Sequence, residues 1–239
     1  MPVRALSDAG VLASWEDAAA ARTAVRPARM LAPALEGAPE DVERWPVGQR
    51  DAALLDLHAA TFSPTLTAVA ACPKCDDELE VVLDVADVRA PHATGDDRHE
   101  LRIDERTVVY RLPTTADLAA IVSEPDPRAA LATRCVTAVR GRRGGVTALP
   151  DGWVDAMSEA MAERDPQAEL DLALTCPSCR HGWTSVLDVG DFVWRTLERR
   201  AQQLLADVAT LAAAFGWSED DVLALSPARR RFYLEMVDT

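Results

Sequence analysis

Four cysteines in two matching pairs are the residues of this chain whose types and spacing best suit chemistry. Cys72 and Cys75 form one Cys-Pro-x-Cys motif, and Cys176 and Cys179 form a second. Such a turn places both sulfur atoms on one side of the backbone, because proline fixes a dihedral angle. Four thiolates bind Zn²⁺ tetrahedrally and leave no position open for a substrate. The spacing therefore predicts one structural zinc ion held by all four cysteines, and no catalytic residue.

The sequence around the two cysteine pairs is also repeated. Residues 72–88 and residues 176–192 both run, after an identical gap, into Val-Leu-Asp-Val-x-Asp and an apolar residue. Alternating apolar and polar residues ahead of each pair indicate a strand, clearly over 170–175 and more weakly over 66–71. Each copy is predicted to be a β-hairpin with the cysteines in its turn. Together the two hairpins would make a discontinuous zinc ribbon.

Repeated aspartates follow both hairpins, and they permit two interpretations. Paired carboxylates can perform acid–base chemistry. However, these aspartates stand where a strand gives way to a helix, and an aspartate at that position caps the helix N-terminus. We therefore interpret them as capping residues: Asp84 and Asp87 in the first copy, Asp188 and Asp191 in the second.

The cysteines also permit a redox interpretation. Cys-x-x-Cys centres of thiol–disulfide enzymes lie at a helix N-terminus in a thioredoxin-like pattern, whereas here strands flank each pair. His181 follows Cys179 by only two residues, so we place it outside the zinc shell. Lys74 and Arg180 could offset the negative charge of a Zn–S₄ core. Cys135 is predicted to be a small buried residue inside a helix.

The rest of the sequence has no arrangement typical of an enzyme. Its four histidines, His58, His92, His99 and His181, are scattered and suggest no base–nucleophile pair. The Gly-Arg-Arg-Gly-Gly loop at 141–145 could cradle a phosphate, but it lacks the lysine and hydroxyl residue of a P-loop. A surface turn is the better interpretation, and we predict that the protein is not an enzyme.

The charge and apolar content of the chain limit the kinds of partner that it can bind. The 239 residues carry 39 acidic and 25 basic side chains, a formal net charge of −14, and 49% of them are hydrophobic. The apolar content argues against disorder, and the charge disfavours nucleic acid and anionic membranes as partners. No apolar run reaches the roughly 20 residues of a membrane span. Charges at Arg4, Asp8, Glu16 and Asp17 interrupt any signal-peptide core, so we expect a cytoplasmic protein.

Apolar periodicity predicts an α+β fold that is mainly helical, with the zinc ribbon at its centre. Pro33, Pro39 and Pro46 are expected to break up the chain after the first helix. A hairpin is expected over 100–112, turned at 104–106. Helices are expected over 8–22 (capped by Ser7 or Asp8), from Pro46 to about Thr61, over 116–123 after Thr114 or Thr115, over about 127–139 and over 150–164.

The C-terminal part is predicted to be helical as well. From Asp191 onward, apolar residues recur at spacings of three and four until Gly216, which predicts one long amphipathic helix. Ser218 with Asp221 resembles a capping box, and Ser226-Pro227 starts a last helix. Trp194 and Trp217 are candidate partner contacts, although core packing is the commoner role of tryptophan.

We expect five segments along the chain. They are an N-terminal helical region (1–62), the first half of the ribbon (63–88), an α+β insertion (89–168), the second half of the ribbon (169–190) and a C-terminal helical region (191–239).

The stretch from Phe215 to Val237, FGWSEDDVLALSPARRRFYLEMV, resembles the T4-type phage baseplate proteins, which include a hub subunit and a hub assembly chaperone. Similar members occur in gene clusters of phage-tail-like contractile injection systems and share the paired Cys-Pro-x-Cys motifs. They also share a Trp-Pro before a leucine-rich helix, here Trp45-Pro46 to Leu57, and a Leu-Pro-Thr segment, here 112–114 leading into Asp117-Leu118. The resemblance runs at intervals along about 190 residues and is most specific over 175–237.

The resemblance implies a role in building the baseplate or hub of a contractile tail, with protein partners and no catalytic residues. The zinc prediction rests on cysteine spacing and not on this resemblance. Two alternatives stay open, a zinc-ribbon protein that binds nucleic acid and a Cys-x-x-Cys thiol oxidoreductase. The oligomeric state, the particular partner and whether the chain remains in the finished particle are not predicted.

Overall fold

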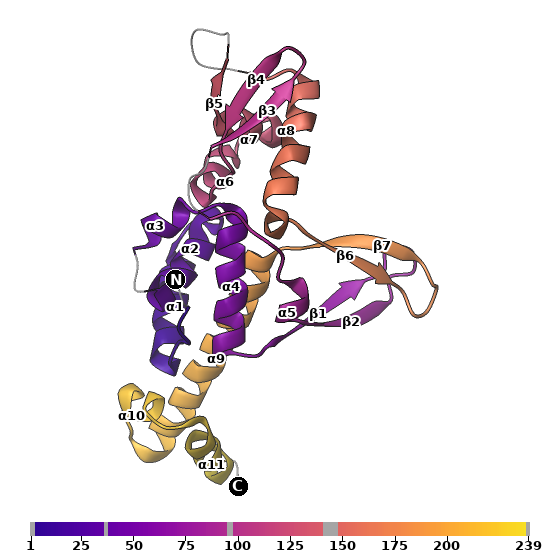
Figure 1. Ribbon diagram of the computed structural model, residues 1–239. Coiled ribbons are helices and arrows are strands. Elements are labelled where there is room, and N and C mark those ends of the chain that lie inside the picture. The colour runs from indigo at the N-terminus through magenta and orange to yellow at the C-terminus, as the bar shows by residue number, and fades with distance from the viewer. Residues whose placement is uncertain (1–2, 36–37, 95–97, 141–147, 238–239) are drawn as a thin grey trace.

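The computed structural model describes residues 3–35, 38–94, 98–140 and 148–237. Figure 1 shows an elongated molecule in which a central group of helices carries three projections. An α+β insertion lies at one end, two short C-terminal helices lie at the other, and two β-hairpins extend to the side. The α+β class predicted from the sequence is confirmed. None of the helices in the described ranges is long and apolar enough to cross a membrane.

The central helices bury one continuous apolar cluster. Leucines from three helices, Leu31, Leu54 and Leu197, are at most 1% exposed within it. As predicted, Ser7 caps the first helix, since its side chain accepts a hydrogen bond from the Gly10 amide. The elements are α1 (Asp8–Ala20), the 3₁₀ turn η1 (Thr23–Val25), α2 (Arg26–Leu35), α3 (Pro39–Glu43), α4 (Val47–Thr61) and the first half of α9 (Val189–Phe215).

One of the three prolines expected to break up this region does not do so. Pro33 lies inside α2, whereas Pro39 is the first residue of a new helix, α3. An internal proline costs a helix about 3 kcal/mol. In α2, however, Met30, Leu31 and Leu35 are all buried, and each such side chain contributes roughly 1.5–3 kcal/mol. Packing of the apolar face therefore outweighs the proline penalty. Pro46 is the residue before α4, one position from its predicted place.

The insertion contains an antiparallel sheet in the order β3-β4-β5, and a second apolar cluster joins this sheet to α7 and α8. The predicted hairpin is confirmed, with Asp104 in its turn at φ 53°. Its elements are β3 (His99–Ile103), β4 (Arg106–Tyr110), α6 (Thr115–Ile121), α7 (Pro127–Cys135), β5 (Val136–Val139), α8 (Asp151–Arg164) and the 3₁₀ turn η2 (Pro166–Ala168).

The helix predicted over 127–139 is wrong in its last four residues. It ends at Cys135, and Val136–Val139 form the third strand, which pairs with β4. β-branched residues fit a pleated sheet better than a helix interior, and an edge of β4 is available there. The following loop, Gly141 to Gly145, lies outside the described residues.

The insertion is fastened to α4 by buried polar contacts. The Val47 amide donates to the Pro113 carbonyl, and Arg50 pairs with Asp51 at 2.7 Å while also donating to Thr115. The Gly48 amide donates to the Asp165 carboxylate at 2.9 Å. A Cβ atom at residue 48 would lie 2.0 Å from that carboxylate, so this close approach requires glycine.

The C-terminal helices follow the predicted pattern. α9 ends at Phe215, and its C-cap Gly216 has a left-handed φ of 69°. Ser218 and Asp221 form a capping box at the start of α10 (Glu219–Leu223). The last helix is α11 (Pro227–Val237).

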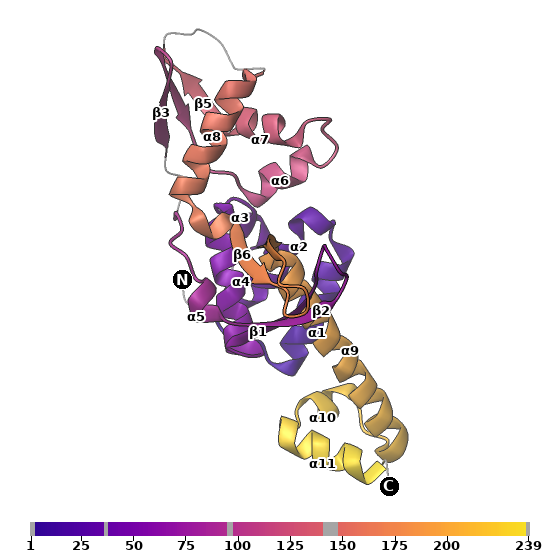
Figure 2. The same ribbon diagram turned by 90° about the vertical axis from the view of Figure 1, so that its right-hand side faces the viewer.

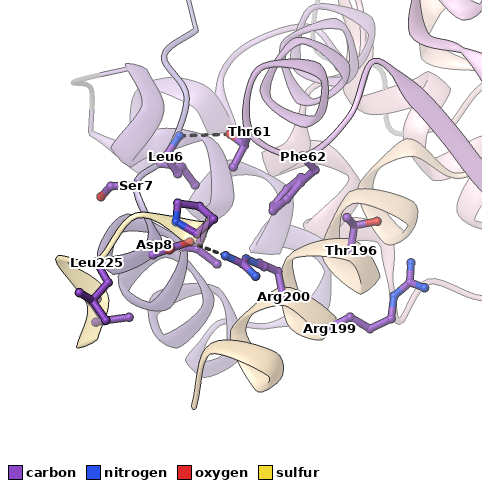
Figure 3. A pocket seen from close by; sticks show the side chains of 12 residues that line it. Leu6, Ser7, Asp8, Thr61, Phe62, Thr196, Arg199, Arg200 and Leu225 are labelled. Carbon is purple, nitrogen blue, oxygen red and sulfur yellow. Dashed lines mark hydrogen bonds and ion pairs between the residues drawn. The ribbon is translucent and has the colours of Figure 1, made fainter. Parts of the chain in front are cut away.

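An ion-pair network ties these helices to α1. Asp8 accepts hydrogen bonds from Arg200 of α9 and from Arg230 of α11. Burial acts to raise the pKa of Asp8, but the two guanidinium groups outweigh it and hold that pKa below its usual value. Figure 3 shows the Asp8–Arg200 contact beside a groove of about 800 Å³ that Leu6, Phe62 and Leu225 also line.

Candidate metal centre

Two β-hairpins form an arm that projects from the central helices. The first pairs β1 (Thr65–Ala71) with β2 (Glu78–Asp84), and the second pairs β6 (Leu170–Thr175) with β7 (Gly182–Leu187), both antiparallel. Figures 1 and 2 show the two hairpins side by side, with their turns together at the far end. We call residues 65–84 and 170–187 the hairpin arm.

The hairpins face each other through their apolar sides. Period-two alternation turns Ala70 and Val81 of the first hairpin and Leu172 and Leu174 of the second toward a shared cavity of about 160 Å³. Leu66, at the base of β1, belongs to the central cluster. The base of the arm is thus anchored in the core. Its far end is far from the core, so the residues of the two cysteine turns must hold the hairpins together there.

The two cysteine turns have the same backbone structure. The Cys72 amide donates to the Asp77 carbonyl, and the Asp76 amide donates to the Cys72 carbonyl. In the second turn the Cys176 amide donates to the His181 carbonyl, and the Arg180 amide donates to the Cys176 carbonyl. Asp76 and Arg180, each directly after its second cysteine, are left-handed at φ 57° and 56°. The repeat in the sequence is therefore a repeat in space.

These turns bring all four sulfur atoms together. The Cys72 and Cys179 sulfurs are 3.6 Å apart and the Cys75 and Cys176 sulfurs 3.7 Å apart, and all four lie within 4.8 Å of one another. A tetrahedral site with Zn–S bonds near 2.3 Å has sulfur–sulfur edges of about 3.8 Å. The four cysteines can therefore hold one metal ion, whereas a disulfide needs sulfurs about 2.05 Å apart.

Two thiols of this cluster have pKa values shifted in opposite directions. Burial acts to raise the pKa of Cys72, but amide hydrogen bonds from Lys74 and Cys75 lower it to about 7. The Asp77 amide acts to lower the pKa of Cys75, yet hydrogen bonds with the neighbouring thiols raise it to about 12. Since metals bind thiolates, a cation at this site displaces protons.

Residues next to the cysteines have distinct roles. The His181 ring stacks on Trp183 with ring centroids 6.3 Å apart, and His181 is not among the four clustered ligands. Lys74 and Arg180 lie in the two turns, as the sequence requires. A hydrogen bond from Ser178 to Asp77 connects the two hairpins directly beside the cysteines. This contact was not predicted, because nothing in either motif alone shows which residues face each other across the repeat.

One aspartate after each hairpin occupies the cap position of the helix that follows. The Asp188 side chain accepts a hydrogen bond from the Asp191 amide at 2.9 Å and so caps α9. Asp84 precedes α5 (Val85–Val88) in the equivalent position, although its side chain makes no capping hydrogen bond. The capping interpretation is confirmed for Asp188 and holds for position only at Asp84. It is wrong for Asp87 and Asp191, which lie inside α5 and α9.

Cys135, Trp194 and Trp217, which the sequence also singled out, all pack against other residues of the chain. Cys135 is fully buried at the end of α7, and burial raises the pKa of its thiol to about 12. Trp194 is 7% exposed beneath the Arg26 guanidinium, so it belongs to the core rather than to a free surface. Trp217 is half-buried and contacts Phe215 and Tyr233.

Two distant segments that carried the family resemblance meet in the structure. Pro46 and Thr114 form an isolated β-bridge, and Thr114 forms a capping box with Asp117. The Trp45-Pro46 and Leu112-Pro113-Thr114 motifs therefore build the joint between α4 and the insertion. Their role here is structural.

Comparison with known proteins gives one family. The model of the family described as T4 bacteriophage base plate protein matches residues 35–194, about two thirds of the chain. The matched region includes both cysteine pairs and ends early in α9, so the stretch 215–237, on which the resemblance was strongest, lies outside it. No curated protein and no solved structure matches the chain.

Proposed function

The chain belongs to the T4 bacteriophage base plate protein family, and from this premise we propose that it is a non-enzymatic structural or assembly protein for the baseplate or hub of a contractile, phage-tail-like injection system. Family membership supports a structural role in a baseplate, with protein partners. The proposal adds two points to family membership: the baseplate is that of a contractile system, and the chain acts like a chaperone during assembly. In this role the chain is made in the cytoplasm and contacts other baseplate proteins.

The family match carries the baseplate role, and the four-sulfur cluster inside the matched region carries the metal part of the proposal. Cys72, Cys75, Cys176 and Cys179 offer four soft donors at tetrahedral spacing, which suits Zn²⁺. With four protein ligands such an ion has no free position for water or substrate, so its role is structural. We therefore assign a structural Zn²⁺ to these residues and describe the hairpin arm as a split zinc ribbon.

The proposed five-segment division fits this role. The central and insertion clusters of apolar residues are separate, and the hairpins at 63–88 and 169–190 flank the insertion on both sides. The metal would hold together two segments whose cysteines are about 100 residues apart in sequence. In the chain-entropy model, closing such a loop stabilises the fold by roughly 4–5 kcal/mol.

Co-purification tests the proposal. A tagged chain is expressed together with the sheath, tube, spike and baseplate genes of its own cluster, and its bound proteins are identified by mass spectrometry. We expect hub or wedge proteins of the baseplate to be recovered. Analysis of purified particles then distinguishes a resident component from an assembly factor, since only a resident component is found in them.

The alternatives predict other outcomes. Recovery of ribosomal or nucleic-acid proteins, together with a mobility shift of nucleic acid at low salt, would support a nucleic-acid-binding ribbon. Turnover in a disulfide-reduction assay would support an oxidoreductase. The short sulfur contacts join cysteines of different motifs, which argues against a redox centre formed within one Cys-x-x-Cys motif.

A further inference from the structure

A pocket of about 230 Å³ lies between α9 and α11. Figure 1 shows α11 beside the C-terminal part of α9, and the two helices are in contact. Side chains three or four positions apart share one face of a helix, so the wall residues of each helix face the space between them. The polar walls are Arg200, Gln203 and Asp207 of α9 and Arg230 and Arg231 of α11.

Arg230 is buried in the wall of this pocket, with 2% of its surface exposed. Its Nε atom pairs with Asp207 at 3.3 Å, and its Nη2 atom pairs with Asp8. Its Nη1 atom has no hydrogen-bond partner among the residues that the structure describes. A buried charged donor without an acceptor is costly, so an acceptor that reached this nitrogen would be stabilised.

The acceptors around the pocket are already in use. One carboxylate oxygen of Asp207 accepts a hydrogen bond from Gln203 at 2.8 Å, and the other pairs with Arg230. The two oxygens of Asp8 accept from Arg200 and Arg230. Because each of these four oxygens already has a donor, the pocket favours a ligand that brings acceptors over one that brings donors.

Positive charge, in contrast, is in excess. Arg231 is exposed, and its guanidinium group makes no ion pair or hydrogen bond within the described ranges. The guanidinium groups of Arg200, Arg230 and Arg231 outnumber the carboxylates of Asp8 and Asp207 by one. In a chain with a net charge of −14, this is a local site at which an anion is attracted.

The donors and the size of the pocket define the class of ligand. Guanidinium groups match carboxylate and phosphate groups in geometry and bind them by charge-assisted hydrogen bonds. The pocket is smaller than the roughly 300–1,000 Å³ of pockets for drug-sized ligands, so it suits one such group. We propose that the pocket between α9 and α11 binds a single oxyanion, supplied either as free phosphate or as a carboxylate side chain of another protein.

Such an anion would join the two helices, because its partners come from both. Binding would stabilise the attachment of α11 to α9. This proposal goes beyond the proposed function, since it concerns the purified chain alone. A pocket that binds no anion would leave baseplate membership untouched, and failure to capture baseplate proteins would leave the anion site untouched.

An NMR titration of the ¹⁵N-labelled full-length chain tests the proposal. The Nε–Hε signals of Arg230 and Arg231 are followed as potassium phosphate is added, with potassium chloride at equal ionic strength as the reference. We expect both signals to shift and to saturate with phosphate only. The melting temperature should also rise more in phosphate than in chloride.

A short glutamate peptide and its glutamine counterpart form the second arm of the titration. Both sources of the oxyanion would support the site, and the two arms distinguish them. Saturation by the glutamate peptide at a lower concentration than phosphate identifies a protein carboxylate as the preferred ligand, and the reverse order identifies free phosphate.

Arg231→Glu should weaken binding of the anion at least about tenfold, because it replaces a charged donor with a like charge. Arg231 is exposed, so this variant should keep its fold. Arg229→Glu is the matched control. It makes the same charge change on the same helix, at an exposed residue that does not line the pocket, and should change the dissociation constant by less than about twofold.

Three results would overturn the proposal. The first is a titration in which neither phosphate nor the glutamate peptide saturates the arginine signals. The second is a shift of the Arg231 signal without that of Arg230, because the anion would then stay on the surface. The third is equal weakening by Arg229→Glu and Arg231→Glu, because net charge alone would then explain the binding.

Discussion

At the scale of single residues, backbone geometry places the cysteine sulfurs. Asp76 and Arg180 adopt left-handed backbone angles, which cost a residue other than glycine roughly 1–2 kcal/mol. Both turns contain this feature at the same position. We interpret it as a cost that metal coordination offsets, because the left-handed residue directs the chain back into the hairpin while both sulfurs stay on one side.

Cys72→Ser tests whether the four sulfurs act as one site. Loss of a single ligand should release the metal from the whole cluster, because the three remaining sulfurs no longer close the tetrahedral shell. We expect zinc per chain, measured by plasma mass spectrometry, to fall from one toward zero. The loss of up to about 4 kcal/mol of stability should lower the melting temperature by roughly 10 °C.

Cys135→Ala is the matched control for that experiment. Cys135 is a buried cysteine outside the cluster, so this variant should keep one zinc per chain and lose only a small amount of packing. If Cys72→Ser retains one zinc with unchanged melting, the shared site is wrong.

Low pH should weaken the attachment of the C-terminal helices, because it protonates Asp8. Its folded-state pKa lies below 3.8, the ordinary value of an aspartate, so the unfolded chain binds the proton more tightly. The contribution of Asp8 is therefore complete above about pH 4 and is lost as pH falls through the folded-state pKa. At pH 7, Asp8→Asn should cost about 2–3 kcal/mol, because Arg230 is buried and loses one of its two carboxylate partners.

Urea unfolding at pH 7 and at pH 3 measures this effect. The difference in stability between wild type and Asp8→Asn should shrink markedly at pH 3, because this pH lies below the ordinary aspartate pKa of the unfolded chain, which then takes up the proton. Asp17→Asn is the control, since its pair with Arg29 is more exposed and should contribute less than about 1 kcal/mol. An Asp8→Asn effect that is equal at both pH values would contradict the assignment.

At the scale of elements, the hairpin arm is the part of the fold that depends most on the metal. A two-stranded hairpin is marginal in water without further packing. Here the base of each hairpin contacts the central cluster, whereas the outward-facing residues of β1 and β2 are exposed. The far ends are therefore held by the cysteine cluster and by the Ser178–Asp77 hydrogen bond.

Metal removal should loosen the arm before the helical core. We expect a chelator to abolish protection from hydrogen exchange in β2 and β7 while amides of α2 and α4 stay protected. The core leucines of these helices, such as Leu31 and Leu54, are fully buried in the central apolar cluster, which contains none of the four cysteines. Unchanged exchange in the arm after verified metal loss would show that the hairpins do not need the ion.

Elements with strong local signals were predictable from sequence. The capping box at Ser218, the stop at Gly216 and the cysteine hairpins all depend on residues a few positions apart. The errors concern tertiary packing. Pro33 remains helical because its neighbours are buried, and Val136–Val139 become a strand because β4 offers an edge. Neither partner can be identified from the local sequence.

At the scale of the whole molecule, the repeat was the one long-range fact that the sequence revealed. Duplicated cysteine pairs predicted that residues 72–75 and 176–179 meet, and the sulfur atoms do lie together. Contacts without a repeated motif stayed hidden. Asp8 and Arg230 are 222 residues apart, and no pattern in either neighbourhood indicates their ion pair. The same holds for the joint between Gly48 and Asp165.

The central claim is that one metal ion is bound by both hairpins through four sulfur atoms. X-ray absorption at the zinc edge of the purified, metal-loaded chain measures this directly. The account predicts one zinc per chain with four sulfur neighbours at about 2.3 Å. A zinc shell with only two sulfur neighbours, completed by nitrogen or oxygen, would contradict it, because each hairpin would then bind metal by itself.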